Sequence, residues 1–312
     1  MNFKKIILPG GAGLVGQNLI PKLKEQGFVN IVVIDKHQHN LAALAELHSD
    51  VKTVYADLTE AGEWQDEFED AYAVVILQAQ IGGKYYEEFV ANNVEATKYI
   101  VQLIQQYNIQ KVVHISSSVV NSVADDFYTR SKIAQEQFIL ESGIDCPILR
   151  PTLMFGWFDR KHLGWLSRFM KKVPLFPIPG NGKYMRQPLY VGDFCNIIVS
   201  CIINDIKADV YDITGLEKID YIDIIREIKT ATGSNTPIVK IPFKAFAALL
   251  AVWALFDKNP PFTLQQLEAL RAPDEFEVID WPGIFDVEPS KFSDALDETF
   301  NHPVFSKIEM EF

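Results

Sequence analysis

The sequence predicts an α/β fold in which a Rossmann-type, doubly wound parallel sheet is followed by a smaller C-terminal lobe. Short apolar runs rich in β-branched residues alternate with segments of helical periodicity over the first half of the chain. Such alternation is typical of parallel β-α-β units covered on both faces. A glycine-rich turn from Gly10 to Gly16 joins the first apolar run to the first helical segment. At 312 residues, the chain has room for one large α/β domain or for two parts.

The expected elements follow one another regularly. The first unit is a strand at residues 5–8, a helix at 14–26 that Gly27 ends, and a strand at 31–34. The pattern then repeats, with strands expected at 51–55, 73–77, 111–115 and 146–150, and helices at 89–107 and 128–142.

The character of the chain changes after Pro151. Turn-forming residues are frequent at 173–182, so this segment is expected to be irregular. We assign residues 1–150 to the Rossmann domain and residues 151–312 mainly to a substrate-binding lobe. Within that second part, a strand near 210–213 is expected to return to the main sheet.

Residues 243–256 form an almost wholly apolar segment that is too short to span a bilayer. A buried or interface helix therefore explains this segment better than membrane association.

Charge and cysteine content argue against several kinds of binding partner. The 41 acidic and 29 basic residues give a net charge of -12, which disfavours binding to nucleic acid or anionic lipid. The three cysteines, Cys146, Cys195 and Cys201, lack disulfide-framework or zinc-ligand spacing, so no metal is expected. The first residues do not resemble a secretory signal, and a cytoplasmic location is expected.

The glycine turn has the features of a nucleotide site. Gly10 and Gly13 would let the backbone turn tightly and approach a pyrophosphate, and Gly16 would let the helix pack closely on the strand. A tight turn without a ligand is the alternative. The unit of strand, glycines, helix and strand spans roughly the ~30 residues typical of dinucleotide sites, which favours the nucleotide.

Two aspartates follow later strands. Asp35 ends the second strand, where its carboxylate can bind ribose hydroxyls and repel a 2'-phosphate, so NAD is favoured over NADP. The adjacent Lys36 and His37 leave NADP open. Asp57 closes the third strand, where it would meet the adenine amino group or cap a helix.

Tyr128 and Lys132 lie one helical turn apart and therefore share a helix face. A free tyrosine has a pKa near ~10, too high for a base at neutral pH, and a neighbouring ammonium would lower it. The pair therefore predicts a proton-transfer device. A chance pair on an amphipathic helix is the alternative.

These motifs together resemble the extended short-chain dehydrogenase/reductase family, the NAD-dependent nucleotide-sugar epimerases and dehydratases. The resemblance covers nearly the whole chain and includes residues 92–97 and the serines at 116–118. It implies hydride transfer in which Tyr128 moves a proton and Lys132 holds the nicotinamide ribose. It also implies that a serine binds the reacting oxygen, Ser117 best by position and Ser118 as the competitor.

The resemblance also assigns binding residues. Asn93 would fix the active-site helix through backbone hydrogen bonds, and Ala79 would leave room for the cofactor. Arg186 would clamp a substrate diphosphate with its planar guanidinium, a solvated surface arginine being the alternative. The residues expected to contact the cofactor are Gly10, Gly13, Leu14, Val15, Gly16, Asp35, Asp57, Leu58, Ala79, Asn93, Tyr128 and Lys132, and those expected to contact the substrate are Ser118 and Arg186. The family commonly forms homodimers through the helix that carries Tyr128 and the helix from Ala91 onward.

Three features depart from the sugar epimerases. The stretch at 118–127 is short, Leu77 and Gln78 replace a more usual His-Leu pair, and the tail at 262–300 resembles an atypical branch related to a complex I accessory subunit. Members of that branch often lose the catalytic residues. Retention of Tyr128, Lys132 and a serine favours catalysis.

Three functions are therefore weighed. The first is an NAD(P)-dependent epimerase or ketoreductase acting on a nucleotide-linked sugar. The second is a nucleotide-binding assembly or scaffold protein. The third is a reductase of a non-sugar carbonyl, suggested by apolar residues near the expected pocket. Core packing explains those residues, Leu153, Phe155, Trp157 and Phe158, equally well.

Overall fold

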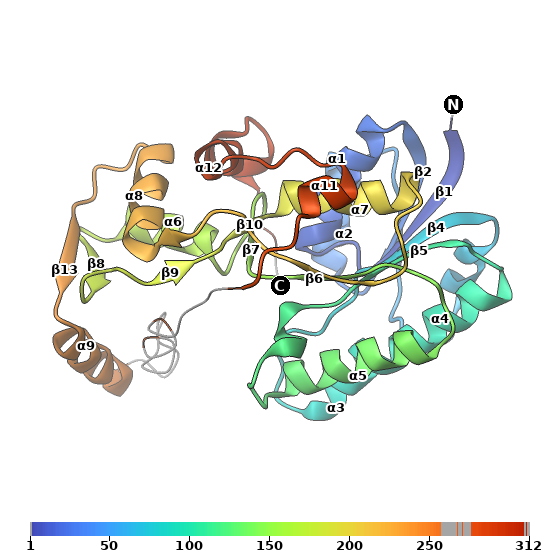
Figure 1. Cartoon of the computed structure of the whole chain (residues 1–312), viewed down its shortest axis with the longest axis horizontal. Helices are drawn as coiled ribbons and strands as arrows, with labels where there is room; N and C mark the ends of the chain where they lie inside the picture. The colour runs from blue at the N-terminus through green and yellow to red at the C-terminus, as the bar shows by residue number, and fades with distance from the viewer. Residues whose placement is uncertain (1, 257–266, 268–269, 271–275, 309, 311–312) are drawn as a thin grey trace.

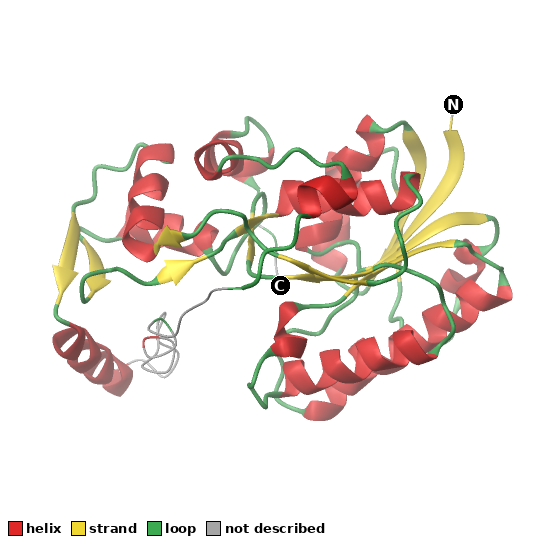
Figure 2. Ribbon diagram, viewed as in Figure 1, coloured by secondary structure: helices red, strands yellow, loops and turns green. Residues whose placement is uncertain are grey.

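The computed structural model describes residues 2–256, 267, 270, 276–308 and 310. Its centre is a seven-stranded sheet in which every neighbouring pair is parallel, in the order β11-β6-β5-β4-β1-β2-β3. Helices cover both faces (Figures 1 and 2). The strands are β1 (Asn2–Pro9), β2 (Phe28–Asp35), β3 (Lys52–Tyr55), β4 (Ala71–Ile76), β5 (Lys111–Ile115), β6 (Ile148–Pro151) and β11 (Val210–Ile213). The predicted doubly wound fold is confirmed.

The alternation of side chains along each strand builds two cores. In β1, Ile6 and Leu8 pack into one core while Ile7 packs into the other. Because both faces are buried, the central parts of the strands are mostly apolar. The first face is covered by α1 (Leu14–Glu25), α2 (Gln38–Leu47), α7 (Val191–Ile203) and α11 (Trp281–Phe285), and the second by η1 (Glu63–Phe68), α4 (Ala96–Gln106) and α5 (Phe127–Glu141).

Two sequence-based expectations differ from the structure. The single helix expected at 89–107 is instead α3 (Tyr86–Phe89), a π-helical turn η2 (Val90–Glu95) and α4. The segment expected to be irregular contains β8 (Phe176–Pro179), which pairs in parallel with β13 (Ile238–Ile241).

Strand β8 tolerates its prolines because of where they fall. The amides of Phe176 and Gly180 donate across to the carbonyls of Pro237 and Ile241, at 2.8 and 2.7 Å. Pro177 and Pro179 occupy positions between these donors and have no N–H to give. The many turn-forming residues of this segment therefore led to the prediction of an irregular segment where a strand is found.

The second lobe has its own core, formed by residues such as Met170, Ile178, Ile225 and Leu296. The lobe lies at the end of the molecule away from the N-terminus (Figure 1). Its elements are β7 (Met154–Phe155), α6 (Leu163–Lys172), β8, β9 (Met185–Arg186), β10 (Leu189–Tyr190), β12 (Ile219–Asp220), α8 (Tyr221–Ala231), β13 and α12 (Phe292–Asn301), with η4 (Phe305–Lys307) following.

Several elements after residue 151 belong to the main domain rather than to the lobe. Helix α7 packs its buried face into the same core as β1 and α1, and α11 joins this core. Strand β11 occupies the segment where a return to the sheet was expected and pairs with β6. The boundary at residue 150 itself stays a prediction.

The apolar segment at 243–256 forms helix α9 (Phe243–Phe256). Leu249 and Val252 are 59% and 54% exposed, so these two side chains are not buried within the chain, and the expected interface helix stays a prediction. Among the residues that the structure describes, no helix combines the length and apolar character needed to cross a membrane. Of the atypical tail at 262–300, residues 262–266, 268–269 and 271–275 lie outside the described part.

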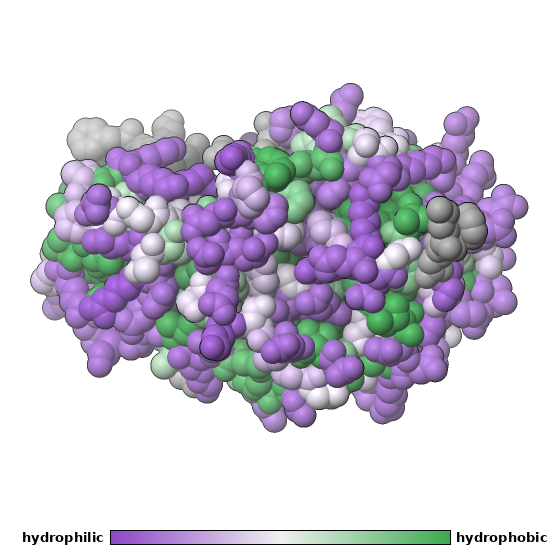
Figure 3. All heavy atoms as spheres, turned by 90° about the horizontal axis from the view of Figure 1, so that it is seen from above, coloured by the Kyte–Doolittle hydropathy of each residue, from purple (hydrophilic) through white to green (hydrophobic). Residues whose placement is uncertain are grey.

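The surface seen from above is mainly polar (Figure 3). Hydrophilic residues cover most of the face shown in Figure 3, and apolar residues interrupt them in separate areas.

Candidate active site

The glycine turn lies at the carboxyl edge of the sheet, beside the loop that follows β4. Gly10 has φ +75°, and a Cβ there would lie 2.4 Å from Cα of Gln78. Strands β1 and β4 are neighbours although β2 and β3 separate them in the chain. This point, where the strand order reverses, is where doubly wound folds bind ligands.

Helix α1 starts immediately after this turn and packs tightly against it. A Cβ on Gly16 would lie 2.1 Å from the carbonyl oxygen of Gly11, so only glycine fits. Gly13 is the N-cap residue and has no side chain to cap the helix, which leaves amides of the first turn for an anion. Leu14 and Val15 follow, half-buried against the first core.

Asp35 closes the turn from the second strand. Its carboxylate accepts hydrogen bonds from the amides of Ala12 and His37, both at 3.0 Å. The Lys36 ammonium lies 3.4 Å from the Asp57 carboxylate and also bonds Asn92. Lys36 is therefore engaged by other side chains, which favours NAD over a 2'-phosphorylated cofactor.

Asp57 closes a local turn. Its Oδ1 accepts from the amide of Thr59 at 2.9 Å and from the Thr59 hydroxyl at 2.8 Å. Because the next helix, η1, begins only at Glu63, Asp57 is not a helix cap. Leu58, next to it, is buried in the second core.

Ser117 and Tyr128 lie together at the carboxyl end of β5. Ser117 is the N-cap of η3 (Ser118–Asn121), and its Oγ accepts from the amide of Val119 at 3.4 Å. Helix α5 starts at Phe127, and its N-cap Asp126 accepts from the amide of Thr129 at 2.8 Å, which fixes the turn carrying Tyr128.

Burial raises the pKa of Tyr128 above its ordinary value of 10.0, and a hydrogen bond with the Ser117 side chain acts in the opposite direction. Of the two candidate serines, Ser117 is the one whose side chain affects the pKa of Tyr128. Ser118 opens η3 one residue later and is half-buried.

Lys132 is buried below this pair. Its ammonium donates to the carbonyl of Ile115 at 3.0 Å and to the side-chain oxygen of Gln135. Burial lowers the pKa of Lys132 to about 7, and Glu136 opposes this shift. Lys132 is not among the groups that shift the pKa of Tyr128. Desolvation of the phenol therefore dominates the pKa of Tyr128 in this structure, and the lowering expected from Lys132 together with the positive nicotinamide stays a prediction.

The depressed pKa of Lys132 predicts a dependence of stability on pH. Between about 7 and 10.5, the unfolded chain holds a proton that the folded chain lacks. Lys132 thus makes the free energy of unfolding rise with pH in this window, by at most about 1.4 kcal/mol per unit. In Lys132→Met this contribution is lost, so wild type should gain stability relative to the variant as pH rises.

Urea denaturation of both proteins at about pH 7 and about pH 9 measures this difference. Lys98→Met, which alters a lysine on the exposed face of α4, is the control for general effects of losing a charge. An identical difference between Lys132→Met and wild type at both pH values would contradict the assignment.

Asn93 connects the loop after β4 to the helix that carries Tyr128. Its Oδ1 accepts from the amide of Gln80 at 2.6 Å, and its Nδ2 donates to the Gln80 carbonyl at 3.1 Å and to Ser131 Oγ at 2.8 Å. Asn93 thus makes hydrogen bonds to the backbone of Gln80, and its contact with α5 is made through the side chain of Ser131. Ala79 is exposed in the same loop.

A buried polar chain that the sequence reasoning missed extends from Lys132. Gln135 receives the ammonium and donates to Thr97 Oγ1 at 2.8 Å, and Gln78 donates to the same oxygen at 2.8 Å. Because Gln78 also packs against Gly10, this chain connects the lysine to the glycine turn. The spacing of Gln135 one helical turn after Lys132 was the available signal.

Arg186 lies in the second lobe on β9. Its guanidinium donates to the carbonyls of Met185 and Leu270, both at 2.6 Å, and the residue is half-buried. A freely solvated surface arginine is therefore the wrong description. Burial raises the pKa of Tyr221, and the charge of Arg186 acts in the opposite direction.

Core packing accounts for most of the apolar residues expected near the pocket. Phe155 packs with Tyr190 and Phe292 in the lobe core. Trp157 and Phe158 are buried in a small separate cluster. Leu153 alone of the four is exposed, at 39%.

Two curated proteins illustrate the range of relatives. The chain is 24% identical over 274 residues to the mitochondrial NADH dehydrogenase [ubiquinone] 1 alpha subcomplex subunit 9 of Arabidopsis thaliana, covering 82% of this chain but only 64% of that protein. It is 25% identical over 290 residues to a sterol-4-alpha-carboxylate 3-dehydrogenase of Schizosaccharomyces pombe, covering 82% and 85%.

Solved structures share the fold. The UDP-glucuronic acid 4-epimerase of Bacillus cereus in complex with NAD superposes with a TM-score of 0.73 at 20% identity, over 96% of this chain and 98% of that one. The enzyme WbmG of Bordetella bronchiseptica, in complex with NAD and UDP, gives 0.76 at 15% identity, over 99% and 98%.

A sequence model of the NAD dependent epimerase/dehydratase family matches residues 6–213. This range contains the glycine turn, the Ser117–Tyr128 pair and Lys132. The match confirms the predicted family, its NAD cofactor and its class of enzyme, the NAD-dependent oxidoreductases and isomerases. The chain belongs to the NAD dependent epimerase/dehydratase family.

Proposed function

We propose that the protein transfers hydride between NAD and a carbon that bears a hydroxyl or carbonyl group, with Tyr128 moving the accompanying proton. The proximity of Ser117 and Tyr128 carries the proposal, since the Ser117 side chain is among the groups that act on the Tyr128 phenol at the carboxyl end of β5. NAD, when bound, supplies the hydride donor or acceptor. Ser117 orients the reacting oxygen, and the proton passes between that oxygen and the Tyr128 hydroxyl.

The Tyr128 phenol can act in either direction of this step. At neutral pH the phenol is protonated, so Tyr128 is ready to give its proton to a carbonyl oxygen as hydride reaches the carbonyl carbon. Oxidation of an alcohol requires Tyr128 to ionise first. The site therefore fits reduction of a ketone, oxidation of an alcohol, or both in turn as in an epimerisation.

For the cofactor, we propose that the pyrophosphate lies on the amides of Gly13, Leu14 and Val15, where Gly10 and Gly16 permit close approach. Asp35 would bind the adenosine ribose. Asp57 and Leu58 would border the adenine, Ala79 and Asn93 would line the path to the nicotinamide, and Lys132 would bind the nicotinamide ribose.

For the substrate, we propose a nucleotide-linked sugar. The half-buried guanidinium of Arg186 supports this proposal because a planar fork of donors suits a diphosphate. Ser118 would contact the sugar beside Ser117. The UDP-glucuronic acid 4-epimerase that shares the fold provides the chemical analogy.

A panel of substrates tests the proposal. Native mass spectrometry of purified protein should detect NAD, and turnover should appear with one or more UDP- or dTDP-linked 4-keto or 4-hydroxy sugars. Arg186→Ala should raise KM for such a diphosphate with a smaller effect on kcat, because the ground state and transition state use the clamp equally. NAD binding without turnover across the panel would contradict the sugar assignment.

A second candidate substrate is an apolar alcohol or ketone. The similarity to a sterol dehydrogenase and the exposed Leu153 favour it. Uncharged steroid ketones therefore belong in the same panel. With these substrates, Arg186→Ala should leave KM unchanged, so the variant separates the two candidates. The scaffold alternative predicts NAD binding but no turnover with either group of substrates.

We also propose a homodimer formed through α5 and the segment of η2 and α4. Ile133 and Leu140 on α5 support it, since they are 43% and 58% exposed although apolar. Sedimentation equilibrium measures the mass directly, and a monomer at micromolar concentration would contradict the proposal.

A further inference from the structure

One buried ion pair lies beside the loop that carries Ser117. Arg150 on β6 donates from Nε to Oε2 of Glu136 on α5 at 3.0 Å, and its Nη2 bonds the other carboxylate oxygen. The side chains of Arg150 and Glu136 are only 19% and 5% exposed. This two-bond arrangement fixes the position of the guanidinium relative to the helix.

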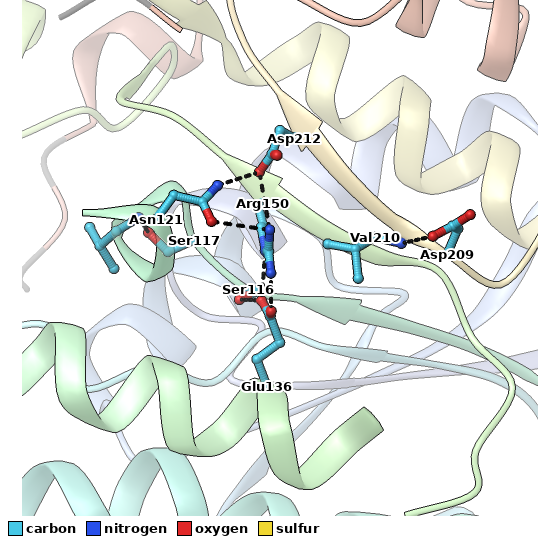
Figure 4. Close-up of polar contacts among 9 residues, drawn as sticks. Ser116, Ser117, Asn121, Glu136, Arg150, Asp209, Val210 and Asp212 are labelled. Carbon is cyan, nitrogen blue, oxygen red and sulfur yellow. Dashed lines mark hydrogen bonds and ion pairs between the residues drawn. The ribbon is translucent and has the colours of Figure 1, made fainter. Parts of the chain in front are cut away.

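The ion pair holds the Ser117 loop at both ends (Figure 4). At its start, the Ser116 hydroxyl donates to Oε2 of Glu136. At its end, Nη1 of Arg150 donates to the side-chain oxygen of Asn121 at 3.3 Å. Ser117 and η3 thus lie between two residues, Ser116 and Asn121, that each bond one member of the Arg150–Glu136 ion pair.

The same pair is connected to Tyr128 through a rigid element. Glu136 lies eight positions after Tyr128 on α5, two turns along one helix, and Lys132 lies midway between them. The hydrogen bond between Ser116 and Glu136 therefore fixes the Ser117 loop relative to the helix that carries Tyr128.

Strand β11 contributes one more side chain to this cluster. Asn121 donates to Oδ1 of Asp212 on β11 at 3.1 Å, and Nη1 of Arg150 lies 3.6 Å from the same oxygen. Strand β11 is the segment on which the chain returns to the sheet after β8, β9 and β10. Asn121 therefore bonds both Arg150 and the strand beside it.

Such a cluster has a cost that suggests a specific role. Burying two charges incurs a desolvation penalty that apolar residues of the same volume would avoid. Here each charge also holds a polar group of the loop, Ser116 on the carboxylate and Asn121 on the guanidinium. Apolar residues would fill the space without holding either end.

We propose that Arg150 is a positioning residue that, with Glu136 and Asn121, holds the loop of Ser117 in place beside Tyr128. The proposal deepens the proposed function, because it concerns the geometry of the same reaction. Misplacing a reacting group by about 1 Å costs about 10²-fold in rate, so loss of one attachment has a measurable effect.

Asn121→Ala is the cleanest test because it removes the attachment at the end of the loop and leaves the Glu136–Arg150 pair intact. Arg150→Lys is the second variant. It keeps a positive charge beside Glu136, but a single ammonium lacks the planar fork that reaches both Glu136 and Asn121. The matched control is Asp209→Asn, which alters an exposed carboxylate next to β11 that bonds Lys207 and the amide of Val210.

We expect kcat to fall about 10- to 100-fold in Asn121→Ala and Arg150→Lys, with the dissociation constant of NAD within twofold of wild type. Asp209→Asn should match wild type in both quantities. A merely structural role would weaken NAD binding in parallel with kcat, and that result would overturn the proposal. So would a kcat within twofold of wild type in both variants.

A second measurement does not depend on turnover. The pKa of Tyr128, followed by NMR of ¹³C-labelled tyrosine and assigned with Tyr128→Phe, should rise in Asn121→Ala because the bond from Ser117 is weakened. An unchanged pKa would overturn the positioning role. If wild type fails to turn over the substrate panel but this pKa rises, the proposed function fails while the positioning role stands.

Discussion

Tyr128→Phe is expected to lower kcat by about 10²- to 10⁴-fold while NAD affinity stays close to wild type. The substitution keeps the ring and its packing at the start of α5. It removes the hydroxyl that bonds Ser117 and, in the proposed reaction, carries the proton. Because KM reflects contacts that do not involve this proton, the loss should appear mainly in kcat.

Initial rates with the best substrate of the panel, together with NAD titration by calorimetry, measure the two quantities. Tyr211→Phe is the matched control: it also removes a bonded phenol, whose hydroxyl donates to the carbonyl of Lys207 at 2.9 Å on the protein surface. Activity near the wild-type level in Tyr128→Phe would show that another group transfers the proton.

The parts of the fold that depend on neighbouring residues were predictable from sequence. The turn from Gly10 to Gly16, the strand before it and the helix after it are set by local sterics and by short-range apolar spacing. The strand ends were correspondingly close: β5 has the expected bounds, and α5 starts one residue earlier than expected. Periodicity and glycine positions contain this information directly.

The parts that depend on distant residues were not predictable in this way. The orientation of Lys132 is decided by Ile115 and Gln135, which hold its ammonium, and burial rather than charge dominates the pKa of Tyr128. Spacing along a helix shows that two side chains share a face. It does not show how deeply each side chain is buried or which acceptors bind the lysine ammonium.

The π-helical turn η2 shows the same limit at the level of the backbone. Apolar periodicity predicted one continuous helix, but Asn93 within η2 bonds both Gln80 and Ser131. These partners come from the loop after β4 and from α5. The π-helical turn depends on contacts with distant segments. Apolar periodicity along the chain therefore does not predict it.

Gly16→Ala is expected to destabilise the protein and weaken NAD binding, the reverse of what helix propensity alone predicts. In a helix, Gly to Ala normally stabilises by about 1 kcal/mol. At Gly16, however, the added carbon would lie 2.1 Å from the Gly11 carbonyl oxygen and 2.5 Å from its Cα. Backbone must move, at a cost of about 1–3 kcal/mol, and the atoms that move form the glycine turn.

Gly82→Ala separates this contact from the general effect of the substitution, because nothing lies within 4 Å of the added carbon at that position. Thermal unfolding should show a lower midpoint for Gly16→Ala and little change for Gly82→Ala. If displacing the turn costs NAD about 1.4 kcal/mol of binding, the dissociation constant rises about tenfold. A more stable Gly16→Ala with unchanged NAD affinity would mean that the turn can relax without disturbing the site. Such a result would show that the helix N-terminus is positioned for the pyrophosphate by something other than the close packing of α1 on the turn.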